Sequence, residues 1–315
     1  MRGGETYSLS VHDKTNSLLA GTSNGLLVMD CATNKIKMAN AKVGAHITKL
    51  VSADEGVYCA TVGGNIFSWN EKDDIFKLLY KGPRGELIYN PTNKAFMWCL
   101  QPTGVAKIDT TTGANQFEQI DNISALCWGP NGSWYVGMLN GNVQKRDAVG
   151  SISKQHQFDG FIKAIKRDPV TNTLFIQDNM QGQIKQCNAD LGDITPISYA
   201  LPSATTITFE HDHASKLLCI LSRTYHTYGI SVDSIHIVHS DCILSKNIKV
   251  MTLDGRYSLS TCDPRTSTFY IAGKNKISVV RPKKLYLALI NQSAFTVFKM
   301  LLHMNKQAAL EGEWI

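Results

Sequence analysis

Two stretches of the chain, roughly 250 residues apart, read almost as copies of each other. The first is TYSLSVHDKTNSLLAG, residues 6–21, and the second is RYSLSTCDPRTSTFYIAG, residues 256–273. Both run Tyr-Ser-Leu-Ser, then a polar turn that contains Asp, then an apolar run that ends in Ala-Gly. An internal repeat constrains the fold strongly, because each copy has to pack against equivalent neighbours. The chain is therefore expected to build its fold from equivalent units.

The paired phrases belong to a longer unit, in which three apolar runs are separated by two polar turns. Seven copies can be aligned, over residues 7–30, 47–70, 86–109, 123–147, 162–188, 206–238 and 257–280. Five third runs end in an acidic or amide residue at spacings of 40, 39, 38 and 41 residues: Asp30, Asn70, Asp109, Asp147 and Asn188. The sixth copy is longer, because an insertion over residues 222–232 stretches its second turn. Short apolar runs between turn residues predict β-strands that are buried on both faces.

Between successive units lies a fourth, weaker apolar run, for example in residues 34–42 and 74–82. Four strands in about 40 residues are typical of one blade of a β-propeller, whose blades close into a ring. We therefore predict an all-β fold, a seven-bladed β-propeller over residues 1–284, or a six-bladed one if the count is wrong around residues 222–250. The first and last blades of a ring are neighbours, which explains why the chain opens and nearly closes with the same phrase.

The repeat resembles that of the WD40 family. The Trp-Asp ending of that family appears in eroded form at four places: Met29 with Asp30, Trp69 with Asn70, Ile108 with Asp109, and Arg146 with Asp147. The Gly-His dipeptide of the family survives only as Gly44 and His46. The resemblance covers residues 7 to about 285 and implies a WD40-like propeller.

The resemblance also implies a structural network within the blades. His46, Thr61 and Trp69 match three members of the family's buried network of His, Ser or Thr, Asp and Trp, but Gly63 stands where the Asp would be. The expected structural residues are His46, Thr61, Trp69, Asp30, Asp109 and Asp147. Members of the family serve in regulatory complexes, as substrate receptors of ubiquitin ligases, in trafficking coats and in RNA-processing assemblies.

The segment after the repeat, residues 285–315, departs from the pattern. Residues 285–291 can form the outer strand of the seventh blade, and Ser293 can cap a C-terminal α-helix that runs to about Glu311. Apolar side chains cover nearly the whole circumference of this helix, so it has to be buried. It either folds back on the propeller or docks on a partner protein or a second copy of the chain. The expected partner-binding residues are Phe295, Phe298, Leu302 and Trp314.

The N-terminus and the cysteines indicate the cellular compartment in which the protein is expected. The N-terminus lacks the apolar core that a signal peptide needs. The most apolar stretch, residues 285–304, contains Asn291, Gln292, Lys299 and His303 and would span a bilayer poorly. None of the eight cysteines forms a Cys-x-x-Cys pair, and the missing signal favours reduced thiols. We expect a cytoplasmic or nuclear protein that is not secreted and has no membrane partner.

No catalytic motif is present in the sequence. The densest group of metal-ligand residues is EHDH, residues 210–213, but Asp212 occupies the turn position that Asp168 and Asp263 hold in sibling copies. Near their starts the inner strands are hydroxylic or apolar and supply no general acid–base pair, as in residues 8–10 and 258–260. We therefore predict no catalytic, metal-binding or cofactor-binding residue and no cofactor.

The formal net charge of +6 is mild, and the basic residues are scattered. Lys163, Lys166 and Arg167 lie together on one inner strand and its turn, but no aromatic residues alternate with them, so nucleic acid binding lacks support. The favoured hypothesis is a non-enzymatic protein–protein interaction scaffold, a subunit or adaptor of a multiprotein complex that docks other protein subunits through its loops and its C-terminal helix. The alternatives are an RNA-binding propeller and, less favoured, a propeller hydrolase with a metal in its channel.

Overall fold

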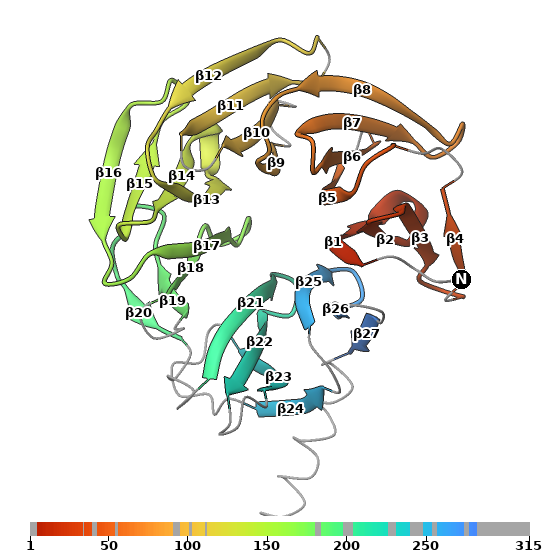
Figure 1. Ribbon diagram of the computed structural model, residues 1–315. Coiled ribbons are helices and arrows are strands. Elements are labelled where there is room, and N and C mark those ends of the chain that lie inside the picture. The colour runs from red at the N-terminus through yellow and green to blue at the C-terminus, as the bar shows by residue number, and fades with distance from the viewer. Residues whose placement is uncertain are drawn as a thin grey trace, which may run out of the picture.

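A computed structural model describes residues 5–33, 35–39, 43–53, 56–90, 95–100, 103–110, 112–179, 184–197, 204–225, 231–239, 248–253, 257–273 and 277–281. Their strands form seven antiparallel sheets, six of four strands and one of three. We call each sheet a blade and number the blades in chain order. The blades stand around a central opening with the first strand of each blade innermost (Figure 1). The predicted all-β propeller is therefore confirmed.

The first four blades follow the repeat units closely. Blade 1 holds β1 (Thr6–His12), β2 (Ser17–Thr22), β3 (Gly25–Asp30) and β4 (Ile36–Met38), with a short 3-10 turn η1 (Asp13–Thr15). Blade 2 holds β5 (Ile47–Ala53), β6 (Gly56–Thr61), β7 (Asn65–Asn70) and β8 (Ile75–Lys81). Blade 3 holds β9 (Glu86–Asn90), β10 (Ala95–Leu100), β11 (Gly104–Asp109) and β12 (Asn115–Gln119). Blade 4 holds β13 (Ile123–Trp128), η2 (Pro130–Gly132), β14 (Trp134–Met138), β15 (Asn142–Arg146) and β16 (Ile152–Gln157).

The last three blades complete the circuit of described strands. Blade 5 holds β17 (Ile162–Arg167), β18 (Leu174–Asp178), β19 (Ile184–Cys187) and β20 (Thr195–Pro196). Blade 6 holds β21 (Ala204–Asp212), β22 (Leu217–Tyr225), β23 (Ser231–His239) and β24 (Ile248–Leu253). Blade 7 holds β25 (Tyr257–Asp263), β26 (Thr268–Gly273) and β27 (Ile277–Val280).

The Asp or Asn that ends the third strand in five copies closes the turn to the fourth strand. The Oδ1 atom of Asp30 accepts hydrogen bonds from the main-chain N–H groups of Ala32 and Thr33, at 2.8 Å each. The same kind of contact is made by Asn70, Asp109, Asp147 and Asn188. A short polar side chain at this position holds a tight turn by bonding its own main chain. The regular spacing of these residues in the sequence is thus the spacing between the turns that join the third and fourth strands of successive blades.

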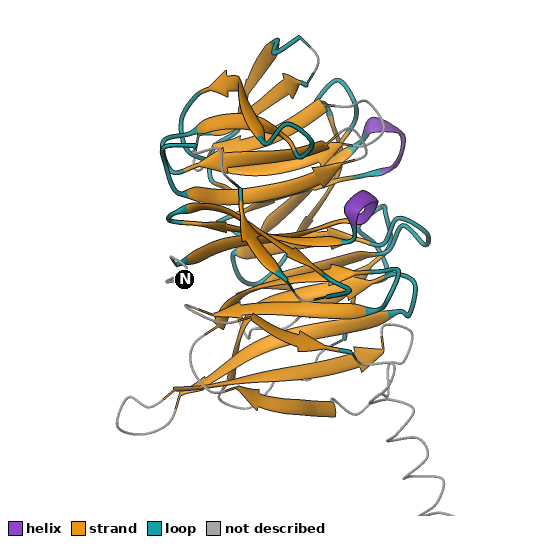
Figure 2. Ribbon diagram, turned by 90° about the vertical axis from the view of Figure 1, so that its right-hand side faces the viewer, coloured by secondary structure: helices purple, strands orange, loops and turns teal. Residues whose placement is uncertain are grey.

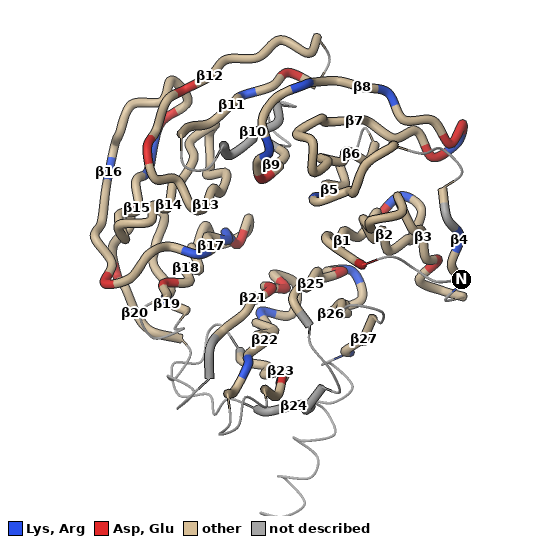
Figure 3. The backbone as a smooth tube through the Cα atoms, viewed as in Figure 1, with Lys and Arg blue, Asp and Glu red and all other residues tan. Residues whose placement is uncertain are grey.

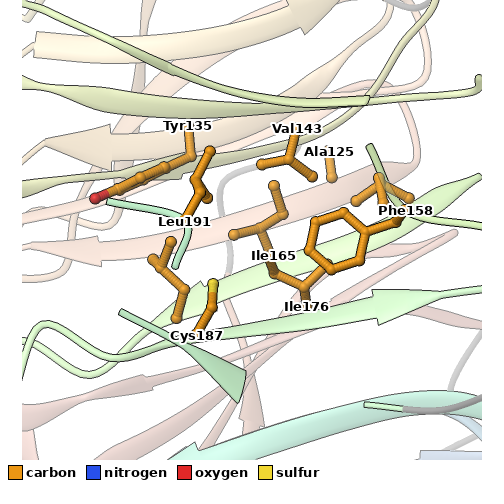
Figure 4. Packing of buried hydrophobic residues seen from close by; sticks show 10 residues of the cluster. Ala125, Tyr135, Val143, Phe158, Ile165, Ile176, Cys187 and Leu191 are labelled. Atoms are coloured by element: carbon orange, nitrogen blue, oxygen red, sulfur yellow. The ribbon is translucent and has the colours of Figure 1, made fainter. Parts of the chain in front are cut away.

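Apolar clusters fill the junctions between neighbouring blades. In the junction of blades 4 and 5, Tyr135 and Phe158 of blade 4 face Ile165, Ile176 and Leu191 of blade 5 (Figure 4). Each of the other six junctions has a cluster of its own, including the one between blade 7 and blade 1. Removal of this apolar surface from water is the main driving force for the ring.

The two ends of the repeat meet, as the copied phrases predict. Leu18 and Met29 of blade 1 pack on Tyr270 of blade 7, and β1 lies beside β25. Arg265 in the first turn of blade 7 donates hydrogen bonds to the main-chain carbonyl oxygen of Asp13 at 2.6 Å and to Oδ1 of Asn16 at 3.2 Å. Side-chain packing and this guanidinium join the ends of the described ring.

The insertion over residues 222–232 differs from the expectation. The sequence predicts a stretched turn there, but the described ends of the insertion continue the strand pairing, as far as Tyr225 of β22 and Ser231 of β23. The predicted C-terminal helix, residues 285–315, lies outside the described residues. Within the part of the chain that the structure describes, no helix is long and apolar enough to cross a membrane.

Candidate functional site in the central channel

Four charged side chains meet at the axis of the ring. Lys49 of β5 pairs with Glu86 of β9, and the Nζ atom lies 2.7 Å from Oε1. Lys166 of β17 pairs with Glu210 of β21 at 2.6 Å. Each pair joins the inner strands of two neighbouring blades. We call these four residues the channel quartet.

The channel quartet is electrostatically coupled. The carboxylate of Glu86 raises the pKa of Lys49, and the ammonium of Lys49 lowers the pKa of Glu86. Glu210 also acts on Lys49, and Lys166 acts on Glu86, so the two pairs influence each other across the channel. Lys49 thus favours the ionised form of Glu86, and each of the two carboxylates is paired with a lysine.

The channel quartet separates two cavities. One of about 630 Å³ lies at the starts of the inner strands, and one of about 650 Å³ lies at their ends. We call the first the start mouth and the second the end mouth. The start mouth is lined, besides the quartet, by Tyr7, Ser8, Leu9, Thr48, Arg84, Gly85, Lys163, Ala164, Thr208, Ser258, Leu259 and Ser260. These residues come from six of the blades, so the site exists only in the closed ring.

Repeated β-bulges shape the start mouth. In six blades the pairing of the first and second strands shifts by one residue near the start of the inner strand. Four of the residues left unpaired by these shifts line the start mouth: Tyr7, Thr48, Lys163 and Ser258. A bulge re-aims the side chain of its extra residue. The fold thereby turns a ring of side chains toward the opening.

The start mouth carries uncompensated positive charge. Within the described residues Arg84 makes no hydrogen bond or ion pair, and Lys163 donates only to the main-chain carbonyl oxygen of Thr206, at 3.1 Å. Partial burial, and then the charge of Arg223, lower the pKa of Lys163. Figure 3 shows basic and acidic residues on the inner strands around the central opening. A cation with no carboxylate partner beside other cations favours a bound anion.

At the end mouth, Arg167 and His12 are bound to other residues of the ring. Arg167 donates from Nε to the main-chain carbonyl oxygen of Trp128 at 2.9 Å and from Nη1 to Oδ1 of Asn172 at 2.6 Å. His12 Nδ1 lies 2.6 Å from Oγ of Ser52, and burial lowers the pKa of His12. The polar groups of this mouth thus hold the ends of the inner strands together.

The predicted blade network is spread over separate contacts. The ring of His46 stacks on Tyr7 of blade 1, with 5.6 Å between ring centroids. Thr61 donates from Oγ1 to the carbonyl oxygen of Asn65 at 3.3 Å, and Trp69 donates from Nε1 to Oδ1 of Asp74 at 3.0 Å. The other three members, Asp30, Asp109 and Asp147, close the turns described above.

The histidine-rich segment at residues 210–213 ends strand β21 and begins the turn to β22. Asp212 is fully buried and accepts a hydrogen bond from the main-chain N–H of Ala214 at 3.1 Å and another from the hydroxyl of Ser215. Across the described ranges, no group of three or more His, Cys, Asp or Glu side chains is placed to hold a metal ion. The predicted partner-binding residues Phe295, Phe298, Leu302 and Trp314 lie outside the described residues.

The sequence reasoning missed the channel quartet and Arg84. The expectation that the inner strands are hydroxylic or apolar holds for residues 8–10 and 258–260, but Glu86 and Glu210 are exceptions on β9 and β21. A signal was available, because a charged residue inside a short apolar strand is uncommon unless it has a partner. Pairing Lys49 with Glu86, however, requires knowledge of which inner strands are neighbours.

Comparison with known proteins identifies the fold. No family model matches the chain, and no curated protein does either. The crystal structure of the β-propeller domain of Cps50 (Swd1) from Myceliophteria thermophila is similar, with a TM-score of 0.72 at 13% identity over 89% of this chain and 98% of that one. Raptor from Chaetomium thermophilum gives a TM-score of 0.68 at 12% identity, over 88% of this chain and 27% of that one.

A third similar structure is a chain of the Mitotic Checkpoint Complex, with a TM-score of 0.66 at 14% identity over 89% of both chains. At such low identities the likeness carries the fold and nothing finer. Together with the radial sheets and the repeat that produces them, it shows that the chain folds as a WD40-like β-propeller.

Proposed function

We propose that the chain is a seven-bladed propeller that serves as a non-enzymatic protein–protein interaction scaffold, a subunit or adaptor of a multiprotein complex. The observation that carries this proposal is the chemistry of the channel. Its two glutamates are each neutralised by a lysine, whereas the cations and hydroxyls of the start mouth are open to a ligand. A rigid ring with recognition groups at its openings is suited to binding.

The similar structures also support the scaffold proposal. One of them is a chain of the Mitotic Checkpoint Complex, which is by its name an assembly of several proteins. Six cysteines whose side chains the structure describes are free thiols: Cys31, Cys59, Cys127, Cys187, Cys219 and Cys262. Free thiols agree with the reducing compartments, cytoplasm or nucleus, in which we propose that the scaffold works.

The proposal includes an α-helix in residues 285–315 as a second docking element. Its apolar residues Phe295, Phe298, Leu302 and Trp314 would contact a partner subunit or a second copy of the chain.

The RNA-binding alternative has less support, because Lys166 is paired with Glu210 and Arg167 is bound to main chain and to Asn172. Neither cation is free to track a phosphate backbone.

Affinity purification of the full chain from native extract tests this function. We expect stoichiometric partner proteins with the wild-type chain, and their loss with Phe295→Asp/Phe298→Asp. The matched control is Val149→Asp, which adds an acidic side chain at a turn position that is 85% exposed and should retain the partners. Light scattering on the same samples measures self-association. A wild-type chain that is recovered alone and as a monomer would contradict the scaffold proposal.

A further inference from the structure

The start mouth holds two cations that have no acidic partner among the described residues. Four basic side chains line it, Lys49, Arg84, Lys163 and Lys166, but only two carboxylates do, Glu86 and Glu210. The carboxylates are taken by Lys49 and Lys166 at 2.7 and 2.6 Å. In the described part of the chain, Arg84 and Lys163 have no acidic partner. Positive charge in a concave site with protein walls focuses the field on its opening and attracts anions.

The start mouth also offers hydrogen-bonding groups from several blades. The β-bulges place the hydroxyls of Thr48 and Ser258 there, and Thr208 and Ser260 line the same cavity. Thr48 donates to the carbonyl oxygen of Ala60 at 3.2 Å and Ser260 donates to Glu210 at 3.4 Å, so the oxygens of these two hydroxyls remain as acceptors. Hydroxyl groups both donate and accept hydrogen bonds, so they suit the alternating N–H and C=O groups of a peptide main chain. The lining residues can therefore select an anionic ligand by charge and hold an extended peptide segment by hydrogen bonds.

The long hairpin of β22 and β23 stands beside this mouth. Each strand has nine residues, and blade 6 lies at the bottom of the ring in Figure 2 as in Figure 1. Lys163 connects to this blade through the carbonyl oxygen of Thr206, which pairs with Ser222 of β22. Farther along β22, Tyr225 is 60% exposed. The hairpin thus extends from the blade that Lys163 contacts, and it carries an exposed aromatic side chain.

We propose that the start mouth binds an acidic segment of a partner protein, with Arg84 and Lys163 contacting its carboxylates. The inference rests on the scaffold function and deepens it by naming the chemistry of the partner. A polypeptide fits better than nucleic acid. Only two cations are open, whereas binding to a phosphate backbone needs a longer basic track and bases stacked on aromatic rings.

Titration with a fluorescein-labelled hexaglutamate peptide, followed by fluorescence anisotropy, tests the site in the full chain. We expect saturable binding at low salt that weakens as salt rises, because the contacts are ionic. Arg84→Gln/Lys163→Gln should weaken binding about tenfold, since it removes two charges from the contact. The control Lys77→Gln/Lys81→Gln removes the same charge from the exposed rim strand β8 and should bind like the wild type. Arg84 and Lys163 are exposed, so thermal unfolding should be unchanged in both variants.

Three results would overturn the site: absence of saturable binding at low salt, an equal loss in both double variants, or tighter binding of a labelled uridine hexanucleotide that depends on Arg84 and Lys163. Purification from extract separates this inference from the scaffold function. Partners that remain on Arg84→Gln/Lys163→Gln would refute the mouth as their docking site and leave the scaffold function intact. A wild-type chain recovered alone would refute the scaffold function instead, and the hexaglutamate titration would still decide the acidic-segment site.

Discussion

Single glycines on the second strands permit neighbouring blades to approach closely. A Cβ atom added at Gly21 would lie 2.6 Å from Cγ2 of Ile47, and one added at Gly137 would lie 2.4 Å from Cγ2 of Ile162. Ile47 and Ile162 begin the inner strands of the following blades. The glycine that ends the copied phrase at residue 21 is therefore retained for packing between blades, because any side chain there would overlap the next blade.

Replacement of Gly137 by alanine should destabilise the ring. The new methyl group meets Cγ2 and Cβ of the β-branched Ile162, at 2.4 and 2.8 Å, and has little room to move. We expect a loss of about 1–3 kcal/mol in the free energy of unfolding, as for other overpacked cores. Urea denaturation measures it, with Gly63→Ala as control, because a Cβ at Gly63 meets no atom within 4 Å. Equal effects of the two substitutions would show that the close approach at Ile162 is not responsible.

The role of a residue could be predicted from the sequence where that role depends on contacts with residues nearby in the chain. An Asp or Asn such as Asp147 bonds main-chain groups two to four residues away, so its type and spacing reveal the turn it closes. The β-bulge that aims Lys163 at the channel has no comparable residue signature, because five residue types occupy the six extra positions, Tyr7, Thr48, Ser124, Lys163, Ile207 and Ser258. The partner of Glu86 lies in another blade, at Lys49, so only the assembled ring brings the two charges together.

At the scale of elements, the junction of blades 7 and 1 depends on one side chain that spans it. Arg265 bonds the fully buried Asp263 from Nε at 3.0 Å and Nη2 at 3.1 Å, and it reaches Asp13 and Asn16 of blade 1. Burial acts to raise the pKa of Asp263, but hydrogen bonds from Arg265 and Thr266 hold the pKa below its ordinary value. The guanidinium thus satisfies a buried carboxylate and connects two turns that are far apart in the sequence.

Replacement of Arg265 by glutamine should loosen this junction. It removes the bonds to blade 1 and leaves Asp263 with its main-chain and Thr266 contacts only. We expect a loss of about 1–3 kcal/mol in the free energy of unfolding, because a buried charge is left partly unpaired. Chemical denaturation checks it, and Arg84→Gln is the matched control, since Arg84 contacts none of the described residues. An equal stability of the two variants would show that the contact between the turns contributes nothing.

Elements were predicted well where turn residues mark their ends. Asp, Asn, Gly and Pro cluster between the strands of blades 1 to 5, and the predicted and observed strands of those blades agree. The prediction was wrong in blade 6, where residues 222–232 contain Gly229 but continue the strand pairing as far as Tyr225 and Ser231. Register between strands, rather than local composition, decides where that hairpin turns.

At the scale of the whole molecule, the ring produces a site that no single blade contains. The channel quartet draws its four members from blades 2, 3, 5 and 6, and the start mouth adds residues of blades 1 and 7. The repeat could therefore predict the ring and its closure, but not the charge of its axis. The charge along the channel depends on residues that differ between the repeat copies. Such residues can determine which partner the chain recognises.

The pair of Lys49 and Glu86 makes ring stability depend on acidity. Lys49 lowers the pKa of Glu86, so in the pH range below the ordinary value of glutamate, about 4.3, the folded chain binds fewer protons than the unfolded chain. The stabilisation is complete above that value and is lost as the pH falls through the lowered pKa. Both side chains are about 40% exposed, at 38% and 41%, so solvent screening limits the contribution to about 0.5–1 kcal/mol.

Glu86→Gln should accordingly lower the free energy of unfolding by about 0.5–1 kcal/mol at neutral pH and by much less near pH 3, because the wild-type carboxylate is increasingly protonated there. Urea denaturation at a series of pH values measures the difference between the two proteins. Glu5→Gln makes the same change at an exposed residue before β1 and should show no such convergence. A Glu86→Gln deficit that stays constant from neutral to acid pH would mean that the charge on Glu86 is not what links blades 2 and 3 across the channel.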